Sequence, residues 1–94
     1  MEIYTMKQWE RDRSLKCEQG QKISADVFYE LLNAVPPTFY RMGIFQCGEP
    51  YAHDYNTGLA LYKTFRYVEN DANGEPIYEY VGLMCDQNLN PKYS

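Results

Sequence analysis

The sequence has few of the features that membrane proteins, nucleic-acid-binding proteins and common enzymes require. No apolar run approaches the about 20 residues that cross a bilayer. The net charge of −4 on 94 residues does not supply the concentrated basic face that binds nucleic acid. There is one histidine, and no nucleophile elbow, phosphate-binding glycine loop or metallohydrolase motif occurs. These absences argue against a membrane-spanning protein, a direct nucleic-acid binder and an enzyme.

Cysteine is also scarce. Three cysteines, an odd number, do not close a disulfide framework, and thiols that are reduced or bound to a metal are typical of the cytosol. The first residues, MEIYTMKQWERDR, lack the apolar segment of a secretory signal. We therefore expect a soluble, cytoplasmic protein that folds as a single domain over residues 1–94.

Aromatic residues are abundant. Ten tyrosines, four phenylalanines and one tryptophan are more than a core of this size needs. Tyrosine combines a broad apolar ring with a polar tip and is enriched at protein interfaces. Two interpretations remain open: the tyrosines form a surface for a partner, or they line the solvent-facing side of a sheet.

Two helices are predicted, over residues 6–18 and 25–34. Thr5 followed by Gln8 matches a capping box at the start of the first helix. Ser24 is the expected N-cap of the second helix. Apolar residues of the second helix recur at positions i, i+3, i+4 and i+7, which is the spacing of one buried face. These residues are Phe28, Leu31, Leu32 and Val35.

Three strands are predicted, over residues 39–46, 59–68 and 77–85, and residues 86–94 are expected to be frayed. The Asn73-Gly74 dipeptide is a strong signal for a hairpin between the last two strands. We therefore predict an α+β fold in which two N-terminal helices pack on a three- to four-stranded antiparallel sheet.

The register of that hairpin depends on the length of its turn. A two-residue turn at Asn73-Gly74 places Tyr67 opposite Tyr80, whereas a longer loop that begins at Asp71 shifts the pairing. Alternation in the last strand assigns its aliphatic residues to one face and its tyrosines to the other. The aliphatic face holds Ile77, Val81, Leu83 and Cys85, and the other face holds Tyr78, Tyr80 and Met84.

A binding surface is predicted on the tyrosine face of this hairpin and the loop before it. Between residues 49 and 86, seven carboxylates face only Lys63 and Arg66, so this half carries a charge of about −5. The asymmetry favours a basic partner and disfavours single-stranded nucleic acid stacked on the tyrosines. The candidate binding residues are Glu49, Tyr51, Asp54, Tyr55, Tyr62, Tyr78 and Tyr80.

Cysteine and histidine side chains offer a second hypothesis. Cys17, Cys47, His53 and Cys85 are the ligand types that zinc prefers in a tetrahedral structural site, although no Cys-x-x-Cys pair is present. The alternative is three small buried cysteines and an exposed histidine, with no cofactor. A third hypothesis pairs His53 with Cys47 or Cys85 as the nucleophile of a hydrolase, oriented by Asp54.

The run LLNAVPPTFYRMGIFQCGEPYAHD carries a resemblance to known proteins. Its Val35-Pro36-Pro37 helix end, followed by Tyr40-Arg41 and Gly48-Glu49-Pro50, resembles small uncharacterised accessory proteins of bacterial plasmids, integrated elements and phages. Several small acidic anti-CRISPR inhibitors are similar in size and composition. The resemblance covers about a third of the chain and transfers no catalytic residue. It implies a non-enzymatic inhibitor or adaptor in the bacterial cytoplasm, whose partner is a CRISPR effector or another nucleic-acid-binding host protein.

Overall fold

A computed structural model describes residues 5–14 and 18–87 of the chain. This part of the chain forms two helices and six strands. In chain order they are α1 (Met6–Arg13), β1 (Lys22–Ile23), α2 (Ala25–Ala34), β2 (Pro37–Arg41), β3 (Ile44–Cys47), β4 (Ala52–His53), β5 (Ala60–Asn70) and β6 (Pro76–Cys85).

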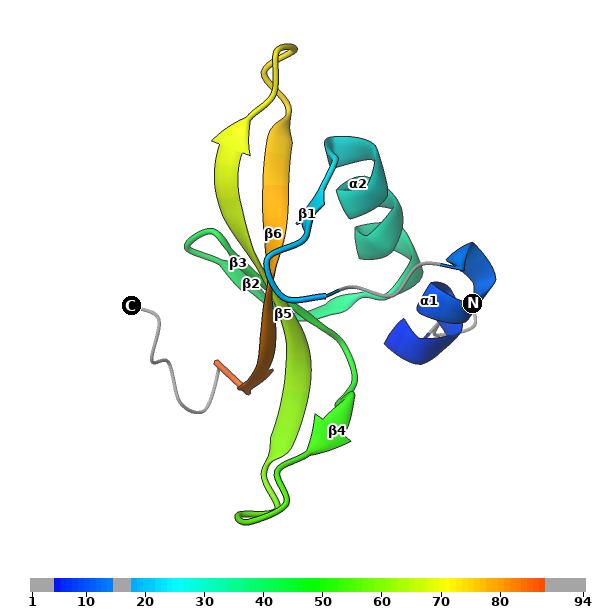
Figure 1. The fold of residues 1–94 in the computed structure, drawn as a ribbon, viewed down its shortest axis with the longest axis vertical. Helices are drawn as coiled ribbons and strands as arrows, with labels where there is room; N and C mark the ends of the chain where they lie inside the picture. The colour runs from blue at the N-terminus through cyan, green and yellow to red at the C-terminus, as the bar shows by residue number, and fades with distance from the viewer. Residues whose placement is uncertain (1–4, 15–17, 88–94) are drawn as a thin grey trace.

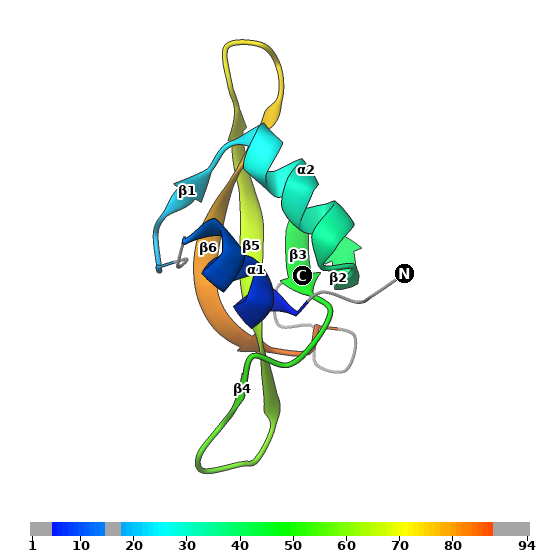
Figure 2. The ribbon, with the colours of Figure 1, turned by 90° about the vertical axis from the view of Figure 1, so that its right-hand side faces the viewer.

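The strands form one antiparallel sheet. Their order is β1-β6-β5-β3-β2, and β4 pairs with the first residues of β5. Both helices lie on the same side of this sheet (Figure 1). Figure 2 shows the β5–β6 turn and the β4–β5 turn at opposite ends of the molecule. The α+β class is thus confirmed, but the sheet has more strands than the three or four predicted.

Helix α2 has the predicted bounds, and its buried face is the predicted one. Ser24 Oγ accepts a hydrogen bond from Val27 N at 3.4 Å, as an N-cap residue does. Phe28 and Leu31 are fully buried against the sheet. The helix ends before Pro36, because proline has no N–H to donate and restricts the residue before it.

Helix α1 is shorter than predicted. It begins at the expected capping box, in which Gln8 N donates to Thr5 Oγ1 and Thr5 N donates to Gln8 Oε1. It ends at Arg13 and not at residue 18, because Ser14 adopts a left-handed φ of 52° and turns its N–H back to Arg11 O. Residues 15–17 lie outside the described part of the chain.

The predicted strand 39–46 is a hairpin. Strands β2 and β3 pair with each other around a two-residue turn at Met42 and Gly43, whose φ angles are 58° and 75°. Two consecutive positive φ angles are the signature of a type I′ turn, which matches the twist of the flanking strands. Gly43 adopts the positive φ of this turn readily because it has no Cβ.

The two faces of β6 are the reverse of those predicted. Tyr78 and Tyr80 point under the helices, and each is only 5% exposed. The Tyr78 ring stacks on Phe28, with ring centroids 4.0 Å apart. On the face assigned to the aliphatic residues, Ile77, Val81 and Cys85 are half-buried and Leu83 is exposed.

The register of the β5–β6 hairpin follows from its longer turn. Asp71 N donates to Glu75 O, and Asp71 Oδ1 accepts from Asn73 N and Glu75 N, so the loop begins at Asp71. The turn alone would place Tyr67 opposite Glu79, and the ladder irregularity between Tyr67 and Glu69 moves its partner to Tyr78, not the predicted Tyr80. A second irregularity, between Thr64 and Phe65, shifts the pairing again farther from the turn.

Strands β1 and β4 were not predicted, because two residues are too few to show an alternating pattern. The backbone creates them. Gly20 N donates to Tyr80 O and Tyr80 N donates to Gln21 O, which aligns β1 with β6. Tyr51 N donates to Leu61 O, which aligns β4 with β5.

Gln87, which follows β6, is buried and hydrogen-bonded, although the segment 86–94 was expected to be frayed. Gln87 is 1% exposed, and its N–H donates to Gln46 Oε1 at 3.0 Å. Gln46 Nε2 donates in turn to Thr64 Oγ1 and to Cys85 O. The prediction is therefore wrong for Gln87, and residues 88–94 lie outside the described residues.

Candidate binding surface

The seven predicted binding residues do not form one surface. Tyr78 and Tyr80 belong to the core. Tyr62 is half-buried on β5, where it neighbours Lys63 in sequence and therefore points to the sheet face opposite the helices. Burial and, second, the charge of Asp86 raise the pKa of Tyr62. The remaining four residues lie between residues 49 and 55.

Two of these four lie next to helix α1. Glu49 is exposed and, with Tyr51, lines a pocket of about 120 Å³ beside the first turn of the helix. The hydroxyl of Tyr51 donates to Glu10 Oε1 at 2.9 Å. The hydroxyl of Tyr51 is thus bonded within the protein, and this bond joins the loop before β4 to α1.

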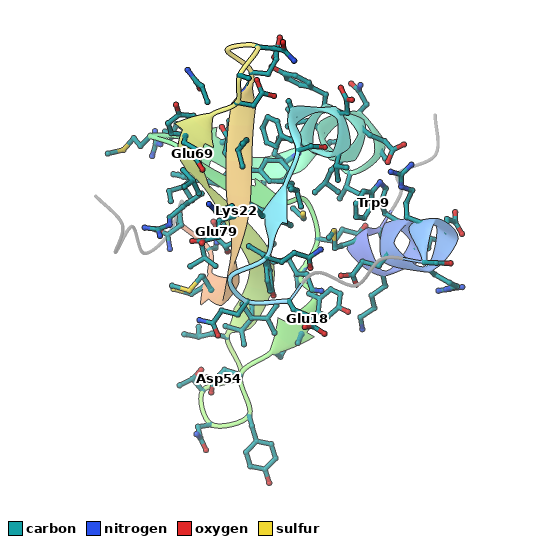
Figure 3. The ribbon with its side chains drawn as sticks, turned by 45° about the horizontal axis from the view of Figure 1, so that its top comes forward. Trp9, Glu18, Lys22, Asp54, Glu69 and Glu79 are labelled. Atoms are coloured by element: carbon teal, nitrogen blue, oxygen red, sulfur yellow. The ribbon has the colours of Figure 1, made fainter. Side chains whose placement is uncertain are left out.

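The other two lie in the β4–β5 turn. Asp54 Oδ1 accepts hydrogen bonds from Asn56 N at 2.8 Å and Thr57 N at 2.9 Å. These backbone N–H groups, that of Thr57 first, hold the pKa of Asp54 below its usual value of 3.8. The turn presents Tyr55 with 99% of its surface exposed. Figure 3 shows Asp54 far from the helices.

The predicted zinc ligands are not gathered in the described part of the chain. Residues 5–14 and 18–87 hold no group of three or more His, Cys, Asp and Glu side chains that could bind a metal. Cys47 is fully buried and its thiol contacts Met6 Sδ at 3.5 Å, whereas His53 is exposed on β4. Cys17 lies outside the described residues, so zinc stays a prediction that metal analysis of the protein decides.

The same placement bears on the hydrolase hypothesis. A nucleophilic thiol must reach both its base and its substrate. Cys47 has no exposed surface, and Cys85 is half-buried at the end of β6. No interaction within residues 5–14 and 18–87 joins either thiol to His53 or Asp54. This geometry therefore gives the hydrolase hypothesis no support.

A different group of tyrosines is exposed together. Tyr29 of α2, Tyr40 of β2 and Tyr67 of β5 are 45%, 49% and 43% exposed. All three surround the buried Tyr78 ring: Tyr40 forms a side-chain hydrogen bond with it, Tyr67 packs edge-on against it, and burial first, then this hydrogen bond and electrostatic interaction with the three phenols, raise its pKa. We call Tyr29, Tyr40 and Tyr67 the tyrosine surface.

The tyrosine surface is backed by packed aromatic side chains. The fully buried Phe28 lies beneath it, 5.5 Å from the Tyr29 ring and 5.9 Å from the Tyr40 ring between centroids. Tyr40 also meets Phe45 edge-on at 5.9 Å. Rings held in this way lose little conformational freedom when a partner binds them.

Acidic residues flank one side of this surface. The hydroxyl of Tyr29 donates to Glu75 Oε2 at 3.3 Å, across the space between α2 and the β5–β6 turn. Asp26 is exposed three positions before Tyr29 and so lies on the same side of the helix. Burial first, and then the charge of Glu75 and this hydrogen bond, raise the pKa of Tyr29.

Sequence patterns missed the tyrosine surface for a simple reason. Tyr29 follows Phe28 and falls just beside the apolar stripe of its helix, where tyrosine is an ordinary residue. Tyr40 and Tyr67 lie far apart in the sequence, and only the sheet order β5-β3-β2 places them near each other. The three tyrosines share one sequence feature: each lies next to a phenylalanine or an arginine within a predicted helix or strand.

Comparison with protein-family models, with curated proteins and with solved structures finds no match for this chain. Within the described residues, no helix has both the length and the apolar character needed to cross a membrane.

Proposed function

We propose that the protein is a non-enzymatic inhibitor or adaptor that binds a basic surface of a nucleic-acid-processing host protein. The observation that carries this proposal is the tyrosine surface, three exposed rings held by a buried aromatic cluster beside the carboxylates of Asp26 and Glu75. Residues 31–54 resemble small uncharacterised accessory proteins of bacterial mobile elements and phages, and several anti-CRISPR inhibitors are similar in size and composition. A CRISPR effector in the bacterial cytoplasm is therefore the first partner to test.

The chemistry of the surface suits a protein partner. Tyrosine and arginine dominate the binding energy of many interfaces, and tyrosine is the residue that the chain exposes together here. Tyr29, Tyr40 and Tyr67 present both ring surface and hydroxyl groups, so they can meet apolar and polar groups of a partner. Negative charge beside the rings would steer a basic surface toward them and make association sensitive to salt.

The proposal is tested with purified CRISPR effector complexes of several types. Each complex is incubated with the protein before target DNA is added, and cleavage of the DNA is measured. We expect inhibition of at least one type, weakened by added salt. The paired variant Tyr29→Ser with Tyr67→Ser should inhibit at least about thirtyfold less strongly, since aromatic hot-spot residues contribute about 2 kcal/mol or more.

Tyr55→Ser is the matched control. It removes the most exposed tyrosine of the described residues, but at the other end of the molecule, so inhibition should be unchanged. Circular dichroism and thermal unfolding confirm that each variant is folded. Failure to bind or inhibit any effector would reject the CRISPR partner, and equal inhibition by the paired variant would reject the tyrosine surface as the site.

A further inference from the structure

The tyrosine surface has a carboxylate fixed against one of its rings. Glu75 lies at the end of the β5–β6 turn, where its N–H is bonded to Asp71 Oδ1 at 3.0 Å. Its side chain accepts the Tyr29 hydroxyl bond through Oε2. A carboxylate has two oxygens and about four acceptor positions. The Tyr29 bond uses one of them, so Glu75 can accept further donors while it stays beside the ring.

The ion pairs of the described residues lie away from the tyrosine surface's carboxylates. The ion pairs within residues 5–14 and 18–87 are Arg13–Glu30, Lys22–Glu69, Lys63–Glu10 and Arg66–Glu79. Figure 3 shows Lys22 beside Glu69 and Glu79 on the neighbouring strands β1, β5 and β6. None of these four pairs includes Asp26, Asp71 or Glu75, so the charge beside the rings is not neutralised by a described lysine or arginine.

A cation that fits this place must satisfy a ring and a carboxylate together. The guanidinium of arginine is planar, stacks on aromatic faces and donates two parallel hydrogen bonds to a carboxylate. The ammonium of lysine is compact and strongly hydrated, and it approaches a carboxylate as a point charge. Both cations meet rings in this protein. The Arg41 guanidinium lies 5.1 Å from the centre of the Phe39 ring. The Lys63 ammonium, in contrast, is bonded to Glu10 and lies 4.2 Å from the centre of the Tyr51 ring, in a site that is closed to solvent. Tyr29 and Glu75 are exposed, so a cation there keeps access to water on one side.

We propose that the tyrosine surface selects arginine over lysine in its partner, with the guanidinium stacked on Tyr29 and bonded to Glu75. This inference rests on the proposed function, because it names the partner chemistry at the same surface. The occupant is therefore an arginine-bearing protein segment. Charge complementarity is the argument for it, and the same carboxylates repel the phosphates of nucleic acid and of anionic lipid.

The test uses oligo-arginine and oligo-lysine peptides of equal length, titrated into the purified protein and followed by calorimetry. Equal charge makes the general attraction equal, so a difference reports the guanidinium. We expect the arginine peptide to bind about threefold more tightly, which is the size of a partly exposed cation–π contact. Two-dimensional NMR spectra should place the largest shifts at Tyr29 and Glu75.

Matched variants separate this site from general attraction. Glu75→Gln and Glu49→Gln remove the same charge from exposed glutamates at different places. Tyr29→Leu and Tyr55→Leu remove a ring from each end of the molecule. We expect the arginine preference to disappear in Glu75→Gln and Tyr29→Leu and to persist in the two controls.

Several outcomes overturn the inference: equal binding of both peptides, binding of neither, tighter binding of a single-stranded oligonucleotide, or equal losses in Glu75→Gln and Glu49→Gln. None of these measurements involves an effector complex. Arginine preference without inhibition of any effector would reject only the proposed function. Inhibition without arginine preference would reject only this inference.

Discussion

The ammonium of Lys63 donates a hydrogen bond to Glu10 Oε2 inside the protein, which joins strand β5 to helix α1. The side chains of the two residues are only 3% and 8% exposed. Nζ of Lys63 also lies 4.2 Å from the centre of the Tyr51 ring and 5.2 Å from that of Tyr80. The ion pair is thus enclosed by aromatic rings, and it joins the short helix α1 to the sheet.

Lys63→Met should destabilise the protein by about 3 kcal/mol, because the buried carboxylate of Glu10 loses its counter-charge. Replacing both partners, Glu10→Leu with Lys63→Met, should cost clearly less than the sum of the single changes. Urea unfolding followed by tryptophan fluorescence measures both, since Trp9 lies on the buried side of α1.

The control is Lys22→Met, which breaks the Lys22–Glu69 pair on the surface. Both side chains of that pair are more than half exposed, and exposed ion pairs contribute at most about 1 kcal/mol. If Lys63→Met were as mild as Lys22→Met, the buried pair would not be holding α1 in place.

Gln46 is the second buried polar residue with a predictable effect. Its amide joins Thr64, the Cys85 carbonyl and the Gln87 N–H, so it holds the end of β6 and the next residues against β3. Gln46→Leu keeps a similar volume but removes all three hydrogen bonds. We expect a loss of about 2–3 kcal/mol and faster hydrogen exchange at the Gln87 amide. Unchanged exchange at Gln87 would contradict this role.

The sequence predicted those elements whose signals are local. Helix α2 has its cap, its apolar stripe and its terminating proline within a short stretch, and it has the predicted bounds. Strands β5 and β6 lie near their predicted bounds because their β-forming residues are bounded by turn residues. Helix α1 was predicted too long, since the left-handed cap at Ser14 has no strong sequence signal.

The faces of the strands and the binding surface could not be predicted in this way. In β6 either face could be the buried one, because tyrosine occurs both in cores and on surfaces. In the fold, the stacking of Tyr78 on Phe28 places the tyrosine face in the core. From the sequence, Lys63 would be expected in solvent. In the fold it is buried because it pairs with Glu10, which lies 53 positions earlier in the chain. Contacts between residues so distant in sequence are properties of the tertiary fold, and a single sequence contains no direct record of them.

Tyr78 should make stability depend on pH in the alkaline range. Burial first, and then its hydrogen bond with Tyr40 and the neighbouring phenols, raise its pKa in the folded protein above the ordinary 10.0. The unfolded chain therefore releases this proton first as the pH rises. The contribution of Tyr78 to stability is complete below pH 10.0 and is lost progressively as the pH rises toward the folded-state pKa.

Tyr78→Phe keeps the ring stacked on Phe28 and removes the ionising group. Its free energy of unfolding should fall less steeply above pH 10.0 than that of the unchanged protein. Urea unfolding at a series of pH values measures the slopes. Tyr55→Phe is the control, because that ring is 99% exposed and its hydroxyl faces solvent in both states. Identical slopes in Tyr78→Phe and the unchanged protein would contradict the buried phenol.

Asp54 gives a prediction of the opposite sign in the acid range. The N–H groups of Thr57 and Asn56 lower its pKa below 3.8 in the folded protein, so its contribution to stability is present above that pH and is lost as the pH falls through the lowered pKa. An NMR titration should show the chemical shifts of the Asp54 carboxyl and of the Asn56 and Thr57 amides changing together below pH 3.8.

Asp54→Asn retains an acceptor oxygen, so the turn should persist while these amides no longer respond to pH. Asp54→Ala should instead speed hydrogen exchange at both amides. A carboxyl that titrated independently of the two amides would show that the turn does not depend on Asp54.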